Sequence, residues 1–316
     1  MENQQTENRV PELDGLRGLA ILLVMLFHIL PESIKLTKNP LFGLLARSVS
    51  MGWVGVDIFF VLSGFLISSI LLNTRDHPHY FRNFYARRIL RIFPLYYLVI
   101  GTIFIFLPIL SPDLASVQQP TWPYYVFYVQ NWFTIPTLIT SNLYSISLYF
   151  GPAWSLAIEE QFYLIWPALV LLLSRRKLAF LSIAIVILSL AARLLLVQFD
   201  NSWKYLQHFI YYGSFTRFDG FSVGALIAIA FRSEQWKRFF SHFAWPVFLV
   251  SVAGMIAIVI NNSDVDPLGK NYWLNTWGYA HYTGVRCAAV DRHHRPQTGP
   301  AAGLFPRPHT GFFRQV

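Results

Sequence analysis

The sequence predicts an all-α membrane protein, a polytopic bundle of transmembrane helices. Its 316 residues are 54% hydrophobic and only 13% charged, about half the charged fraction of an average soluble domain. Apolar runs of roughly 18–22 residues, long enough to cross a bilayer, recur along the chain. A single cysteine, Cys287, excludes disulfides and cysteine-based metal clusters within the chain.

Seven segments are predicted to span the membrane: 13–30, 53–72, 92–110, 152–173, 178–198, 214–231 and 243–260. The first follows a polar stretch and has no small-residue cleavage site, so we interpret it as a retained helix and not as a signal peptide. The fourth opens with Trp154 and Ser155, and Ser155 is a residue type that caps helices. The sixth contains Gly220 and Gly224, a GxxxG pattern that indicates close helix packing.

The loops between these segments predict the orientation. Basic residues gather in the loops after the second, fourth and sixth spans, whereas 111–151 has no Lys or Arg. Because basic loops stay in the cytoplasm, the N-terminus is expected inside and the loops 31–52 and 111–151 outside, in a bacterial cytoplasmic (inner) membrane. The exception is 31–52, which holds Lys35, Lys38 and Arg47.

The net charge of +9 comes largely from these inner loops and from the tail. Basic residues that flank spans fit contact with anionic lipid headgroups. They do not form the soluble basic patch of a nucleic-acid-binding protein.

The end of the chain differs from the rest. Residues 1–280 are interpreted as one membrane domain that is incomplete at its C-terminus, and 281–316 as an atypical tail rich in His, Arg and Pro. Its composition predicts disorder, and a truncation or a change of reading frame would explain the sudden shift. The histidines lack a metal-ligand spacing, so no metal site is predicted.

Ionisable residues in or beside the spans fall into two groups by depth. The outer group is His28, Asp57, Glu159, Glu160, Arg217 and Asp219, and the inner group is Arg17, Arg87, Arg88 and Arg91. Ionisable groups at membrane depth are costly and mark functional sites. The sequence therefore predicts an acid–base set and an anion-binding set on opposite sides of the bundle.

His28 is the candidate general base, because imidazole titrates near ambient pH. Asp57 or Glu159 would orient it, and a simple hydrogen-bonding role at the interface is the alternative. One of Glu159 and Glu160 is expected to be functional, although both also suit a helix start. Ser63 is expected to serve packing and not nucleophilic attack.

Arg88 and Arg91 are spaced i, i+3, so they share a helix face and suit phosphate binding. Ordinary flanking of a span by basic residues is the alternative. Arg17 lies roughly 16 Å from His28 along one helix. It either reaches back to the inner surface or binds an anion or a carboxylate.

The chain resembles the acyltransferase-3 family of integral membrane O-acyltransferases. The matching stretches, in order, are ELDGLRGLAILLVMLFH, GWVGVDIFFVLSGFLI, FYARRILRIFPLYY, PAWSLAIEEQFYLIWP and RFDGFSVG. The resemblance implies transfer of an acyl group, often acetyl, from cytoplasmic acyl-CoA to an extracytoplasmic carbohydrate such as O-antigen, exopolysaccharide or peptidoglycan. Such proteins usually have about ten helices, whereas seven are predicted here.

The resemblance implies that His28, Asp57 and Glu159 act in catalysis and that Arg17, Arg88 and Arg91 bind acyl-CoA, the donor substrate. Trp154, Glu160, Arg217 and Asp219 are expected to bind the acceptor or to support the structure. No tightly bound cofactor is expected. The partners are the bilayer, acyl-CoA and a carbohydrate; the oligomeric state does not follow from the sequence.

Two other functions fit the same residues. A transporter could use intramembrane Arg, His and Asp as a proton relay. A non-catalytic or inactive family member would fit the abnormal C-terminus. Acyl-CoA breakdown that depends on an acceptor distinguishes the enzyme from both.

Overall fold

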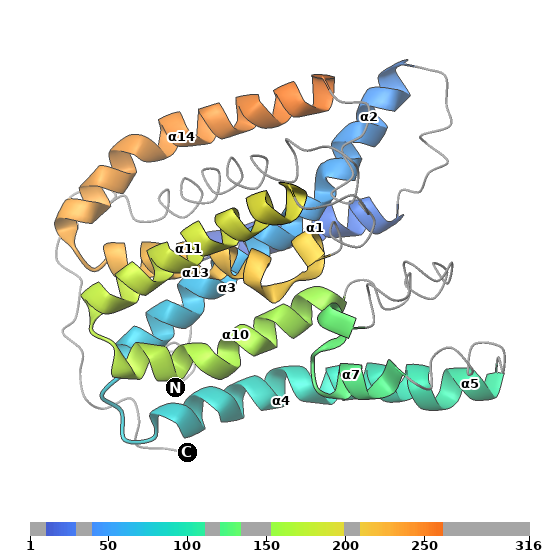
Figure 1. The fold of residues 1–316 in the computed structure, drawn as a ribbon, viewed down its shortest axis with the longest axis horizontal. Coiled ribbons are helices and arrows are strands. Elements are labelled where there is room, and N and C mark those ends of the chain that lie inside the picture. Colours follow the sequence, from blue (N-terminus) through green and yellow to red (C-terminus); the bar gives the residue numbers. More distant parts are fainter. Residues whose placement is uncertain (1–10, 30–39, 111–120, 134–152, 199–208, 262–316) are drawn as a thin grey trace.

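A computed structural model describes residues 11–29, 40–110, 121–133, 153–198 and 209–261 (Figure 1). The long helices in these ranges are α1 (Pro11–Ile29), α2 (Pro40–Ser50), α3 (Val54–Asn73), α4 (Tyr80–Gly101), α10 (Ala153–Leu172), α11 (Arg175–Gln198), α13 (Ser214–Ala230) and α14 (Glu234–Asn261). The short ones are η1 (Met51–Trp53), η2 (Thr102–Phe106), α5 (Leu107–Leu110) and α7 (Trp122–Val126). The predicted tail, 281–316, lies outside the described residues.

The prediction of an all-α membrane bundle is confirmed. Each of the seven predicted spans overlaps a helix. Four helical segments of the described chain are long and apolar enough to cross a membrane: Ser48–Asn73, Tyr80–Leu110, Ala153–Leu172 and Arg175–Leu196. Of the other helices, α13 has only 17 residues and carries Arg217 and Asp219.

The third predicted span begins too late. Its helix starts at Tyr80 and not at residue 92. Residues 80–91 include four arginines, so a search for apolar runs does not predict that they form part of this helix. Their helix can form inside a bundle because protein groups there satisfy some of the polar side chains, as the site below demonstrates.

Helices α3 and α13 form the centre of the bundle (Figure 1). Helix α1 packs on α3, α11 packs on α13, and α10 contacts both central helices. In Figure 1, α4 lies beyond α10 on one side, whereas α14 lies on the opposite side of the centre.

Small residues let α3 and α13 approach until their backbones touch. A Cβ atom added to Gly64 would overlap the carbonyl oxygen of Phe221, and one added to Gly224 would overlap that of Val61. The predicted close packing is therefore confirmed at Gly224. Beside it, the Phe221 ring stacks between Phe60 and Phe162, with 4.6 Å between ring centroids in each pair. This aromatic stack joins α3, α13 and α10.

Candidate functional site

A buried polar cluster lies where α3, α4 and α10 meet; its members are Ser63, Arg88, Glu159, Glu160 and Tyr163, and we call it the Glu159 cluster. Arg88 Nη2 lies 3.0 Å from Glu159 Oε1, and Arg88 Nε lies 3.7 Å from Glu160 Oε1. The hydroxyls of Ser63, at 2.8 Å, and Tyr163 also donate to Glu159 Oε1. One guanidinium thus serves two carboxyl groups.

The Arg88 guanidinium also stacks on an aromatic ring. Its Cζ atom lies 3.4 Å from the ring centroid of Tyr163, a cation–π contact. The side chains of Arg88 and Glu159 are only 15% and 8% exposed. Glu159 Oε1 accepts three hydrogen bonds, and one of them comes from the Arg88 cation. Glu159 is therefore suited to fixing charge and orientation.

Contacts that α10 makes with α4 and with Arg75, which lies in the turn before α4, place Arg88 at this depth. Arg75 Nη2 donates to the carbonyl of Leu171 at 2.6 Å, Tyr80 to that of Pro167 at 3.0 Å, and Tyr85 to that of Leu164 at 2.9 Å. Donors later on α4 meet acceptors earlier on α10, so the two helices run antiparallel. The expected separation of Arg88 from Glu159 and Glu160 is wrong, because α4 enters the bundle before the apolar run begins.

A second buried pair joins the two central helices. Asp57 Oδ1 on α3 lies 2.5 Å from Arg217 Nη2 on α13, and both side chains are almost fully buried. The Arg217 Cζ atom lies 5.2 Å from the ring centroid of Tyr211 and 5.6 Å from those of Phe60 and Trp154. Trp154 is thereby part of the wall around Arg217.

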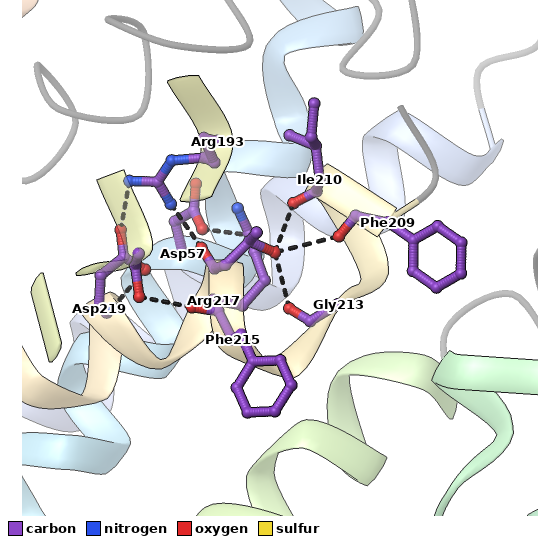
Figure 2. Close-up of polar contacts among 11 residues, drawn as sticks. Asp57, Arg193, Phe209, Ile210, Gly213, Phe215, Arg217 and Asp219 are labelled. Atoms are coloured by element: carbon purple, nitrogen blue, oxygen red, sulfur yellow. Dashed lines mark hydrogen bonds and ion pairs between the residues drawn. The ribbon is translucent and has the colours of Figure 1, made fainter. Parts of the chain in front are cut away.

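A third buried pair joins α11 to α13 (Figure 2). Arg193 Nη2 on α11 lies 2.9 Å from Asp219 Oδ2, and Arg193 Nη1 donates to the Thr216 carbonyl at 2.5 Å. Sequence reasoning missed Arg193. The available signal was that it is the only charged residue in the predicted span 178–198.

A neutral network, also missed, ties residues 128–131 to α10 and α13. Gln161 Nε2 donates to the carbonyl of Tyr128 at 2.7 Å and to Asn131 Oδ1 at 3.0 Å. Asn131 Nδ2 in turn lies 3.0 Å from Ser214 Oγ. Burial raises the pKa of the Tyr128 hydroxyl, so that hydroxyl stays protonated at physiological pH. The segment that follows α7 is thus attached to α10 and to the start of α13.

The remaining predicted residues lie at the periphery. His28 is exposed near the end of α1, and its Nδ1 is 2.8 Å from the Val24 carbonyl. Arg17 Nη1 lies 3.4 Å from Asp14 Oδ1 on its own helix, with the Arg17 side chain 33% exposed. Arg91 is exposed on α4.

The structure thus brings Arg88 to Glu159 and Asp57 to Arg217. Among the described contacts, His28 meets a carbonyl of its own helix; its predicted pairing with Asp57 or Glu159 stays a prediction. No group of three His, Cys, Asp or Glu side chains within the described ranges is arranged to hold a metal ion.

Comparison with known proteins gives one family. A family model described as an acyltransferase domain matches residues 10–290. YrhL of Bacillus subtilis is 33% identical over 243 residues, which cover 73% of this chain and 35% of YrhL. The peptidoglycan O-acetyltransferase OatA of Listeria monocytogenes is 35% identical over 51% of this chain and 24% of its own length.

The O-acetyltransferase OatA of Staphylococcus aureus is 29% identical over 78% of this chain and 37% of its own length. The matches therefore cover only 24–37% of the length of these three curated relatives. No solved structure matches the chain.

Proposed function

Because the chain belongs to the acyltransferase-3 family, we propose that it is a membrane O-acyltransferase that moves an acetyl group from cytoplasmic acyl-CoA to a hydroxyl of an extracytoplasmic carbohydrate. The names of its relatives favour a peptidoglycan-type acceptor, with O-antigen and exopolysaccharide as the alternatives. The strongest support for the proposal is that the family model matches residues 10–290. This range contains both residues of each buried ion pair: Arg88–Glu159, Arg193–Asp219 and Asp57–Arg217.

We propose His28 as the general base. A carbonyl oxygen only accepts hydrogen bonds, so the contact with Val24 requires a proton on Nδ1. In the neutral imidazole this leaves the lone pair on Nε2, which is the nitrogen able to take a proton. The exposed position of His28 leaves that nitrogen accessible to a substrate from outside the described bundle.

The proposed reaction is direct transfer. Nε2 of His28 takes the proton of the sugar hydroxyl while the sugar oxygen attacks the thioester carbonyl carbon. The tetrahedral intermediate collapses, the carbon–sulfur bond breaks, and CoA leaves as a thiolate that takes up the proton. The products are an O-acetyl sugar and free CoA, so the reaction needs no oxidant and no metal.

We propose that Arg17 and Arg91 contact the phosphates of CoA and that Arg88 contributes less. Arg17 and Arg91 are both more exposed than Arg88, which already serves Glu159 and Glu160. We propose that Asp57 and Glu159 neutralise the buried arginines Arg217 and Arg88, with which they form ion pairs.

Reconstituted protein tests the proposal with acetyl-CoA on one side of the bilayer and soluble peptidoglycan fragments on the other. We expect release of free CoA thiol only when the acceptor is present, and acetyl esters on the fragments. Movement of a solute across the bilayer without thiol release would support the transporter. Neither thiol release nor acetyl esters, from protein that elutes as one folded species, would contradict the enzyme.

A further inference from the structure

Arg193 on α11 donates hydrogen bonds to two groups in the first turns of α13, namely the backbone carbonyl of Thr216 and the carboxylate of Asp219. Arg193 is 2% exposed and is the only charged residue of α11 after Lys177. A buried charge at this position costs free energy unless its partners are fixed. The side chain therefore has a geometrical consequence for α13.

The two contacts fix the rotation of α13 about its own axis. Thr216 and Asp219 are three residues apart and share the helix face toward α11. Arg217 lies one residue after Thr216, about 100° further around the helix, and reaches Asp57 on α3. The planar guanidinium holds both groups with donors in a fixed fork, whereas an ammonium group has three rotatable donors without that geometry. Figure 2 shows Arg193, Asp57, Arg217 and Asp219 in one polar network around the first turns of α13.

Other contacts hold the same turn less directly. Ser189, four residues before Arg193, donates to the carbonyl of Phe215 at 2.6 Å. The Thr216 hydroxyl lies 2.8 Å from the carbonyls of Ile210 and Gly213. Arg193 differs from Ser189 and from the Thr216 hydroxyl because it contacts two groups that flank Arg217 in the sequence. These are the backbone carbonyl of Thr216 and the side chain of Asp219.

We propose that Arg193 is a positioning residue for acyl transfer, acting with Asp219 to hold Arg217 against Asp57. The inference rests on the proposed function. Arg193 touches no substrate and acts only through the Asp57–Arg217 pair. Without the two hydrogen bonds of the Arg193 guanidinium, the first turns of α13 could rotate. Arg217 would then leave its place between Asp57 and the rings of Trp154 and Tyr211.

The test is Arg193→Lys, which keeps the buried charge and loses the fork, beside the control Ser189→Ala, which removes a neighbouring α11–α13 hydrogen bond. With acetyl-CoA and peptidoglycan fragments, Arg193→Lys is expected to lower kcat about tenfold, because small misplacements of a catalytic constellation cost that much or more. The KM for acetyl-CoA should stay within about twofold of the wild-type value, since the phosphate-binding arginines are elsewhere. Equal kcat for Arg193→Lys and Ser189→Ala would overturn the proposal.

A double-mutant cycle separates positioning from a general structural role. In the background Arg217→Lys, the further change Arg193→Lys should reduce kcat by less than about twofold, because the two residues act as one unit. A full multiplication of the two single effects would mean that Arg193 acts independently of Arg217, and the proposal would be wrong.

Hydrogen–deuterium exchange gives a readout that does not depend on transfer. Arg193→Lys should speed amide exchange in residues 214–222 more than Ser189→Ala does, even if the wild-type protein transfers no acetyl group. Wild-type inactivity with this exchange pattern would count against the proposed function alone. Unchanged exchange in 214–222 would count against the role of Arg193.

Discussion

Removal of the Arg88 side chain should destabilise the bundle more than it weakens acyl-CoA binding. Arg88→Ala leaves two carboxyl groups, Glu159 and Glu160, without their guanidinium in the interior. Loss of one partner of a buried ion pair costs about 3–5 kcal/mol. Ser63 and Tyr163 would still donate to Glu159, so we expect the lower end, about 3 kcal/mol.

The assay is thermal unfolding of the purified protein in detergent, followed by the fraction that still elutes as a monodisperse species. For a chain of this size about 3 kcal/mol corresponds to a fall in Tm of roughly 4–5 °C. Arg87→Ala is the matched control, because Arg87 is exposed on the same helix and its Nε donates to the Asn83 carbonyl of that helix. Its Tm should stay within about 2 °C of the wild type.

A second variant tests the physical cause. Arg88→Met combined with Glu159→Gln and Glu160→Gln removes all three charges and keeps side chains of similar volume, so it should recover a large part of the lost Tm. Equal Tm values for Arg88→Ala and Arg87→Ala would refute the reasoning, since they would mean that the Glu159 cluster contributes no more than an exposed arginine.

Three further results are expected. Arg91→Ala should raise the KM for acetyl-CoA about tenfold or more by removing a charge-assisted phosphate contact; an unchanged KM would leave Arg91 as a topological residue. Gly224→Ala should cost about 1–3 kcal/mol of stability by forcing α3 and α13 apart, whereas Gly101→Ala, which meets open space, should not destabilise the fold. A phosphatase reporter active only outside the cytoplasm should be silent when fused at residue 76 and active at residue 119, and the reverse pattern would invert the topology.

The helices were largely predictable, because each apolar run must form its backbone hydrogen bonds within itself. The start of α4 was not. Its first turns are polar, and what makes them helical within the bundle is the set of acceptors on α10, including the Leu164 and Pro167 carbonyls. Those acceptors are nearly 80 residues or more away in sequence, so periodicity cannot reveal them.

The candidate site was predictable in its residue types and not in its pairs. Asp57, Glu159 and Arg217 stand out as ionisable groups in apolar surroundings. Which cation meets which carboxylate depends on helix rotation and depth, and a depth estimate from apolar runs placed Arg88 too far from Glu159. Arg193 carried the same signal as the others, a lone charge in a span, and its partner Asp219 follows from the packing of α11 on α13.

The central claim is that His28 supports transfer of acetyl groups to a surface carbohydrate. Its most direct test is mass spectrometry of cell-wall glycans from cells that lack this protein and are supplied with either the wild-type chain or His28→Ala at equal membrane levels. The account predicts acetyl esters on glycan hydroxyls with the wild-type chain and none with His28→Ala. Equal acetylation in both strains would contradict the role of His28, and no acetylation in either would contradict the claim that this chain is the transferase.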